Sequence, residues 1–426
     1  MSIREEPPTI APQDFLSQRR PRFVGLARRI FLAIVAAQRR GDIGTLRLTD
    51  ASGAHPTVRV IGRGPLAADL TINDRAAYAA FVYGGSRGLG RGYVNGLWDT
   101  TDLTSLMRYL LRATHPSRRR LDALVRRWGF VLGVVRRRGP SQGEDRDNIH
   151  AHYNLSNEFF ELMLDPSMAY SCAIFAEPTT SLADAQFEKF DRICRQLRLT
   201  ASDHVVEIGT GWGGFAIHAA RHYGARVTTT TISENQRAAA VARVQAAGMS
   251  HLVSVLGEHY EELTGTYDAL VSVEMIEAVN WRLYDRYFAK CSSLLNEHGR
   301  MMIQAITIGD QSFDRAKYQE DFIRDLIFPG GGLPSVAAML ASTARVTDLR
   351  AVDLYDMGLH YATTLDHWRS AVHDQENAVR ALGFDDRFGR LWDLYLGYCE
   401  SAFLERHISD VQLMWHKPRV GQSLSY

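Results

Sequence analysis

The sequence predicts an α/β protein in which a doubly wound parallel sheet with helical insertions follows a smaller α+β domain. From residue 204 onward, short apolar runs rich in β-branched residues alternate with helical segments, which is typical of a parallel sheet. The first of these runs leads into a glycine-rich turn and a helix, the arrangement that begins a nucleotide-binding sheet. A chain of 426 residues is long enough for two cores, and the polar segment 139–147 predicts domains at 1–145 and 146–426.

The predicted sheet is organised around the strand His204–Ile208 and the turn after it. Glu207 lies near the end of this strand, and Gly209, Gly211 and Gly213 follow at alternate positions. Glycine permits a tight turn and a close approach of the backbone to a ligand. The spacing resembles the first motif of class I S-adenosylmethionine (SAM) methyltransferases, in which such an acid lies near the methionine part of the cofactor. A glycine-rich turn with a purely structural role is the alternative that the motif alone leaves open.

The amino-terminal domain is predicted to be small and mixed in secondary structure. Its alternating segments and turn residues predict a basic helix, three strands and two helices, over 15–40, 45–49, 57–61, 68–72, 74–82 and 101–113. Residues 1–140 hold 24 arginines, no lysine and 10 acidic residues, a net charge of +14, whereas the remainder carries −13. The first domain therefore favours an anionic partner.

Arginines are densest over residues 118–138, where they surround an apolar face that includes Trp128 and Phe130. This pattern favours an anionic membrane surface, and a solvated helix between the domains is the alternative. No run approaches the roughly 20 apolar residues of a membrane span, and the four scattered cysteines have neither metal nor disulfide spacing. We therefore expect a cytoplasmic protein held peripherally on the inner face of the cell membrane.

The larger domain is predicted to contain seven strands and at least four helical segments. The strands are expected over 204–208, 226–231, 253–256, 269–273, 300–306, 346–354 and 411–416, and the helices over 149–164, 182–197, 280–294 and 316–326. Ligands of such a sheet bind at the carboxyl ends of the strands. Polar residues after the second strand suit ribose, and those after the third suit adenine. The two acids after the fourth strand, Glu274 and Glu277, are unusual, although capping the next helix is a structural alternative for Glu277.

Several motifs resemble those of the cyclopropane fatty acid synthases and mycolic acid cyclopropane synthases. They lie at 152–160, 168–173, 327–335 and 360–365, with a further one at 88–98 in the amino-terminal domain. Because they occur in the family's order and cover nearly the whole chain, the chain is identified as a member of that family.

The resemblance implies a set of site residues. The family transfers the SAM methyl to a cis double bond of a lipid acyl chain and holds a bicarbonate ion against the reacting carbon. Gln304 departs from the family, where histidine is usual, since glutamine donates a hydrogen bond but cannot carry a proton. Carried over by position, the bicarbonate pocket would consist of Cys172, Glu277, Gln304, Ile306 and Tyr361. The implied SAM contacts are Tyr170, Ser171, Glu207, Gly209, Gly211, Gly213, Thr231, Ile232, Gln236, His259 and Tyr260, and no metal site is expected.

The chemistry requires a pocket of this kind. Attack of the alkene on the sulfonium methyl leaves a carbocation, which water must not reach. Aromatic rings such as those of Tyr170 and Tyr361 stabilise a cation, and a base, here bicarbonate, then removes one proton. Because no attack by a protein nucleophile is needed, a pocket-lining role is preferred for Cys172.

The fate of the cation decides the product. Proton loss with ring closure gives a cyclopropane, whereas a hydride shift before proton loss gives an exocyclic methylene, which a separate reductase converts to a methyl branch. The pattern of residues 273–279 and 304–307 resembles actinobacterial enzymes of the methyl-branching type, associated with tuberculostearic acid. We therefore predict a 10-methylene product on an unsaturated phospholipid acyl chain, with cyclopropane formation as the alternative.

Two other classes of function remain open. A SAM enzyme that acts on a small molecule or RNA is one, although the basic half shows no RNA-binding motif and we expect no nucleic-acid partner. A non-catalytic lipid-binding protein is the other, and the nearly complete set of site residues argues against it. The sequence leaves the oligomeric state open, a homodimer included.

Overall fold

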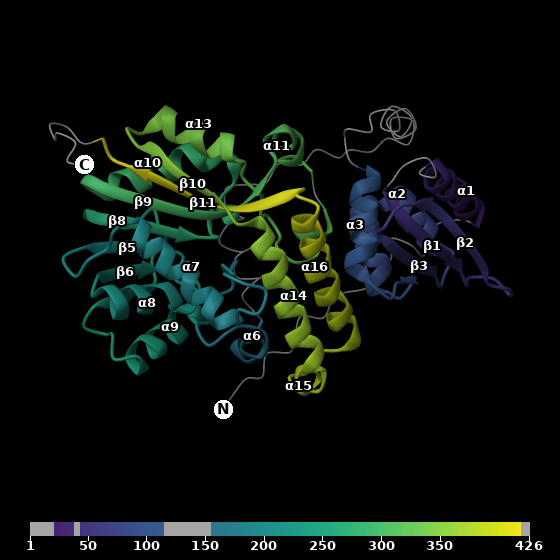
Figure 1. Cartoon of the computed structure of the whole chain (residues 1–426), viewed down its shortest axis with the longest axis horizontal. Coiled ribbons are helices and arrows are strands. Elements are labelled where there is room, and N and C mark those ends of the chain that lie inside the picture. Colours follow the sequence, from purple (N-terminus) through teal and green to yellow (C-terminus); the bar gives the residue numbers. More distant parts are fainter. Residues whose placement is uncertain (1–20, 38–42, 115–154, 320, 419–426) are drawn as a thin grey trace. The chain divides into compact units, whose positions relative to one another are not determined.

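The structure is a computed structural model that describes residues 21–37, 43–114, 155–319 and 321–418 (Figure 1). The chain forms two compact units. The first combines Met1–Ser141 with Asp321–Asp325 and Gln375–Glu405, and the second combines Gln142–Glu320, Leu326–Asp374 and Arg406–Tyr426. Two segments from the second half of the sequence thus belong to the amino-terminal unit. The predicted division into 1–145 and 146–426 places both of them in the other domain. The arginine-dense stretch 118–138 and the predicted boundary segment lie outside the described residues.

The amino-terminal unit is built on a four-stranded sheet in the order β2-β1-β3-β4. β1 pairs antiparallel with β2 and parallel with β3, and β3 pairs antiparallel with β4. The elements are α1 (Pro21–Ala37), β1 (Gly44–Asp50), β2 (Thr57–Arg63), β3 (Ala67–Ile72), α2 (Ala76–Val94), β4 (Trp98–Asp99), α3 (Leu103–Thr114), most of α12 (Phe322–Leu326), α15 (Glu376–Ala381) and α16 (Asp386–Leu404).

The late segments belong to this unit because they fill its core and neutralise its arginines. Phe322 and Leu394 are fully buried in the same apolar cluster as Tyr78 and Trp98. Glu405, just after α16, accepts hydrogen bonds from two arginines of α3, Arg108 at 2.7 Å and Arg112 at 2.7 and 2.8 Å. Other ion pairs join Arg91 to Asp325 and Arg390 to Asp99.

The second unit carries a seven-stranded sheet in the order β10-β11-β9-β8-β5-β6-β7. The five strands from β9 to β7 are parallel, and β11 runs antiparallel to both β9 and β10. The strands are β5 (His204–Ile208), β6 (Arg226–Thr230), β7 (Val253–Leu256), β8 (Tyr267–Val273), β9 (Leu295–Ile308), β10 (Arg350–Asp356) and β11 (Ile408–His416). The helices are α6 (Asn157–Met163), α7 (Leu182–Gln196), α8 (Gly214–Tyr223), α9 (Glu234–Ala246), α10 (Tyr284–Ser293), α11 (Asp310–Ala316), α13 (Val336–Val346) and α14 (Gly358–Asp374).

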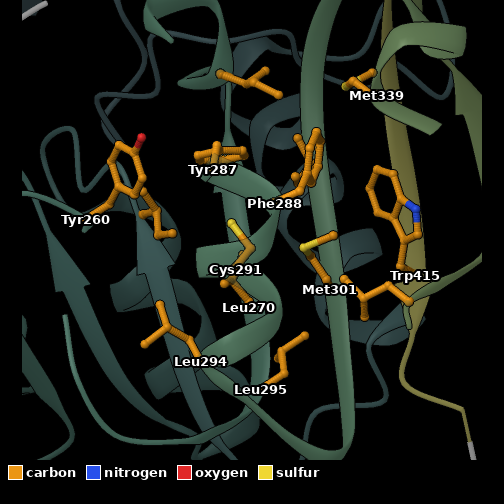
Figure 2. Packing of buried hydrophobic residues seen from close by; sticks show 14 of the residues in the cluster. Tyr260, Leu270, Tyr287, Phe288, Cys291, Leu294, Leu295, Met301, Met339 and Trp415 are labelled. Atoms are coloured by element: carbon orange, nitrogen blue, oxygen red, sulfur yellow. The ribbon is translucent and has the colours of Figure 1, made fainter. Parts of the chain in front are cut away.

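Helices cover both faces of this sheet, as the predicted doubly wound fold requires (Figure 1). One core lies beneath α10 and α13, where Tyr287, Phe288 and Met339 pack against Met301 of β9 and Trp415 of β11 (Figure 2). A second core lies beneath α7 and α8 and includes Phe190, Ile193 and Phe215. Because the central strands are buried on both faces, their sequences are continuous apolar runs.

Several predicted elements differ from those observed. In place of the helix expected over 316–326 there are two short helices, α11 and α12, and the strand expected from residue 300 begins at Leu295. The helix expected to end at Val82 continues to Val94 with a kink at Gly85, and a Cβ on Gly88 would lie 2.1 Å from the carbonyl oxygen of Ala80, so glycine there permits close packing. The helix expected from residue 149 begins, within the described residues, at Asn157, because the Ser156 side chain caps it by accepting from the Phe159 amide. The strand expected from residue 346 begins at Arg350, since α13 continues through Val346.

Candidate active site

The glycine-rich turn after β5 has the strained geometry that the SAM motif needs. Gly209, Gly211 and Gly213 have positive φ angles of 101°, 51° and 83°. The Gly209 amide donates to the carbonyl oxygen of Thr230 at 3.0 Å, which ties the turn to the end of β6, and Gly213 is the residue before α8. Side chains other than glycine rarely adopt these angles, so the three glycines suit a backbone that approaches a ligand closely.

Glu207 is almost completely buried beneath this turn, with 2% of its surface exposed. Burial raises the pKa of Glu207 to about 8. Its Oε2 atom has no hydrogen-bond partner among the described residues. A buried acceptor without a partner among the described residues, one residue before the carboxyl end of β5, fits a SAM methionine group that donates to it.

The other predicted SAM contacts lie at the next two strand ends. The Thr231 hydroxyl donates to Oε1 of Gln236 at 3.1 Å, and Ser233 caps α9 by accepting from the Gln236 amide. After β7, the rings of His259 and Tyr260 lie 4.5 Å apart. Tyr260 also packs into the core against Tyr287, so its ring is held rigidly (Figure 2). Ile232, between these groups, is half-buried.

Tyr170 and Ser171, which precede α7, lie beside a buried lysine. The Tyr170 ring packs between Phe160 and Trp368, with centroid distances of 5.2 and 5.1 Å. Lys189 of α7 is fully buried and donates to the Ser171 hydroxyl at 2.7 Å. Burial lowers the pKa of Lys189 to about 8, against the raising effect of nearby carboxylates that include Glu274.

The centre of the predicted catalytic site is the carboxylate of Glu274, at the end of β8. Its Oε1 accepts from the Cys172 amide at 2.8 Å and from Nε2 of Gln304 at 2.9 Å, and its Oε2 accepts from the Tyr361 hydroxyl at 2.6 Å. Glu274 thus brings together three of the five residues that the resemblance assigned to the bicarbonate pocket.

Gln304 links this carboxylate to a second one. Its Nε2 also donates to Oδ2 of Asp410, on β11, at 2.9 Å, and its Oε1 accepts from Gln412 at 3.1 Å. An amide nitrogen has two hydrogens, so it can donate to both carboxyl groups at once. Burial and the charge of Glu274 raise the pKa of Asp410 well above its usual value, which favours a protonated Asp410.

Glu277 and Ile306, the remaining two residues, contact each other. Oε1 of Glu277 accepts from the Ile306 amide at 2.5 Å, whereas its Oε2 has no hydrogen-bond partner among the described residues. Burial, followed by the charge of Glu274, raises the pKa of Glu277 to about 8. The Cys172 thiol is fully buried, and burial raises its pKa well above the usual range, so it does not provide a thiolate nucleophile.

These contacts test whether the site fits a bicarbonate ion. The Cys172 amide, the Gln304 amide and the Tyr361 hydroxyl, the donors expected to hold the ion, all bind the carboxylate of Glu274. The Ile306 amide binds Glu277. An anion added to this arrangement would lie against a carboxylate and would find the donors expected for it already occupied, so the residues as they are placed do not fit it.

Sequence reasoning did not assign a role to three residues at this centre. Glu274 was noted only as an unusual second acid at a strand end, and that position was the available signal. Asp410 and Lys189 carried no signal, because each lies within an otherwise ordinary strand or helix pattern and reaches the site only through the fold.

Comparison with known proteins identifies the family of this chain. The family model described as mycolic acid cyclopropane synthetase matches residues 141–413. The chain belongs to this family. The tuberculostearic acid methyltransferase UfaA1 of Mycobacterium tuberculosis is 39% identical over 347 residues, which cover 78% of this chain and 79% of that protein. The cyclopropane-fatty-acyl-phospholipid synthase of Escherichia coli K12 is 31% identical, covering 83% and 89%.

A solved structure supports the cofactor. Mycolic acid cyclopropane synthase CmaA1, complexed with SAH and CTAB, matches with a TM-score of 0.60 and 29% identity, covering 64% of this chain and 98% of that one. This member of the mycolic acid cyclopropane synthetase family is therefore a SAM-dependent C-methyltransferase with the class I fold, and the predicted family, the predicted fold and the predicted SAM cofactor are confirmed.

Proposed function

We propose that the protein transfers the SAM methyl carbon to the cis double bond of an unsaturated phospholipid acyl chain and forms a 10-methylene product. The observation that carries this proposal is the greater identity, 39% against 31%, to a tuberculostearic acid methyltransferase than to a cyclopropane-fatty-acyl-phospholipid synthase. Cyclopropane formation from the same cation is the second candidate, supported by the family model.

The residues of the chain have distinct roles in this reaction. When bound, SAM supplies an electrophilic methyl group. The glycine turn and Gln236 hold the cofactor at the ends of β5 and β6, and Glu207 orients its methionine part. Tyr170, packed between Phe160 and Trp368, offers a ring face to a developing cation. The carboxylates of Glu274 and Glu277, which follow the carboxyl end of β8, stabilise positive charge where water is excluded.

The acyl chain is proposed to come from the inner face of the cell membrane, where the basic amino-terminal unit would bind anionic lipid. No helix of the described residues is long and apolar enough to cross a membrane. A separate reductase would then convert the methylene to a methyl branch. The oligomeric state stays open, a homodimer included.

The test is incubation of the purified protein with SAM and vesicles of oleoyl phospholipid, followed by analysis of the fatty acids. The methylene and cyclopropane products have the same mass, so proton NMR, which separates vinylidene from ring protons, must accompany mass spectrometry. A vinylidene signal supports the proposal. Ring protons alone select the second candidate, and unchanged oleate in the presence of bound SAM contradicts both.

A further inference from the structure

We propose that Glu274 is the base of this reaction: its carboxylate, built into the chain, stands in the place expected for bicarbonate and takes the proton from the transferred methyl group. This inference rests on the proposed function and adds a catalytic residue to it. The donors expected around the ion already surround the side chain of Glu274.

The three donors hold the Glu274 carboxylate from three different parts of the unit. The Cys172 amide lies in the loop before α7, Gln304 lies on β9, and Tyr361 lies on α14. The side chain is fixed in one orientation, yet the residue is only half-buried, unlike Cys172 and Gln304, which are fully buried. Oε1 accepts two of these bonds and Oε2 accepts one, so Oε2 keeps a further lone pair and can accept a proton while these bonds persist.

The backbone at Glu274 is strained in a way that places this side chain. Its φ angle is +48°, in the left-handed region that residues other than glycine seldom adopt. Its amide donates to the carbonyl oxygen of Gln304 at 2.8 Å, so the strained turn is tied to β9. Strain of this kind persists only where surrounding contacts enforce it, and it is frequent at functional sites.

The other ionisable groups nearby suit the task less well. Hydrogen bonds from Tyr361, Cys172 and Gln304 favour the charged form of Glu274, although burial raises its pKa overall. Glu277 and Asp410 have raised pKa values, caused by burial and by the negative charge of Glu274 itself. Lys189 supplies a positive charge nearby, and the Cys172 thiol stays protonated. Of the three carboxyl groups, Glu274 is the one that three hydrogen-bond donors hold, and such donors favour the charged form.

The step balances without a further reactant. The π electrons of the alkene form the new carbon–carbon bond while the methyl–sulfur bond breaks, so the neutral thioether S-adenosylhomocysteine leaves and the chain carries a cation. A hydride shift moves the cation to the carbon that bears the new methyl. A methyl C–H bond then supplies the electrons of the exocyclic double bond, and Glu274 takes the proton. Glu274 then returns this proton to water after the product leaves.

The experiment compares the wild type with Glu274→Gln and Glu274→Gly in buffer freed of carbon dioxide, with and without added bicarbonate or formate. Loss of a general base costs about 10²–10⁴-fold in rate, so we expect kcat of both variants to fall by about 10²-fold or more. We expect the wild type to be equally active without bicarbonate. Glycine suits the positive φ angle and vacates the donors, so we expect added bicarbonate or formate to restore about tenfold or more of the lost rate in Glu274→Gly.

Two measurements separate catalysis from folding. Binding of S-adenosylhomocysteine by calorimetry and the melting temperature should be close to wild type in Glu274→Gly. Arg198→Gly is the matched backbone control, because Arg198 has a φ angle of +49°, is exposed and lies outside the site. It should keep wild-type turnover.

The kinetic isotope effect with trideuteromethyl SAM distinguishes a base from a residue with a structural role, because a structural role would leave this isotope effect unchanged. If Glu274 removes the proton, the isotope effect on kcat should rise in Glu274→Gln, because proton loss becomes slower. Dependence of the wild type on added bicarbonate, near wild-type turnover of Glu274→Gln, or lost turnover with an unchanged isotope effect would overturn the inference. If the wild type forms neither the methylene nor the cyclopropane product, the proposed function is contradicted, whatever the role of Glu274. The failure of the proposed function and the failure of this inference are therefore distinguishable.

Discussion

At the scale of single residues, the site depends on how buried carboxyl groups share protons. Glu207, Glu274, Glu277 and Asp410 all have raised pKa values, and burial is the largest cause for each. Water no longer solvates the charged form, so a carboxylate stays ionised only where donors compensate. Glu274 has three such donors, whereas Glu207 and Glu277 each keep one oxygen without a partner among the described residues.

This difference predicts a pH-dependent stability for Glu207→Gln. The folded-state pKa of Glu207, about 8, lies above its value in the unfolded chain. Its stabilising contribution is therefore complete below about pH 4.5 and is lost as the pH rises through 8. From pH 5 to pH 9, the free energy of unfolding of Glu207→Gln should therefore rise by about 2–4 kcal/mol relative to that of the wild type. Urea unfolding at both pH values measures this, and an unchanged difference would show that Glu207 is not ionising in this range.

Gln304→His tests the bridge between two carboxyl groups. A neutral histidine donates from one ring nitrogen on that side, so the bond to Glu274 or the bond to Asp410 is lost. We expect stability to fall by about 1–3 kcal/mol and turnover to fall or the product ratio to change. The affinity for SAM should not change, because Gln304 contacts Glu274, Asp410 and Gln412 and none of these is a predicted SAM contact. Calorimetry and product analysis measure these effects. If Gln304→His had the kinetics and products of the wild type at every pH, the bridge between Glu274 and Asp410 would have no role in the reaction.

At the scale of elements, the SAM site includes a turn whose positive φ angles favour glycine. A Cβ on Gly209 would lie 3.2 Å from Cβ of Met275, in addition to the strain of a φ angle of 101°. Met275 follows Glu274, so the turn after β5 packs on the turn after β8. The cofactor end and the carboxylate end of the site are thus in contact.

Gly209→Ala should weaken SAM binding by more than it weakens the fold. Gly248, after α9, is the matched control, because its φ angle is 72° and a Cβ there would meet nothing within 4 Å. Both substitutions should cost about 1–3 kcal/mol of stability through backbone strain. Only Gly209→Ala should raise the dissociation constant for SAM, by about tenfold or more. Equal SAM affinities in the two variants would contradict a role for the turn in binding.

At the scale of the whole molecule, charge is divided between the two units. The late segments bring more acids than bases to the amino-terminal unit, so its net charge is +10, against −9 for the other unit. Several of its arginines are ion-paired, among them Arg108 and Arg112 with Glu405. The surplus that remains still favours an anionic surface.

Replacing Arg118, Arg119, Arg120, Arg126 and Arg127 with glutamine should weaken binding to anionic vesicles. Each arginine near such a surface contributes about 1 kcal/mol, less at high salt. SAM affinity should be unchanged. Co-sedimentation across a salt series measures the effect. The matched control replaces five exposed arginines of the other unit, Arg198, Arg221, Arg226, Arg286 and Arg315. If both sets pellet as the parent does, the docking surface lies elsewhere.

What the sequence by itself determined was local. The strand, the three glycines and the following helix are contiguous, so their spacing predicts both the turn and the cofactor, and the motif order predicts the family. Only the tertiary structure decided which donors hold the carboxylate of Glu274. Its donors Gln304, Tyr361 and Cys172 lie 30, 87 and 102 residues away along the chain. A carboxylate's protonation depends on burial and on such distant partners, which become neighbours only when the sheet and α14 have formed.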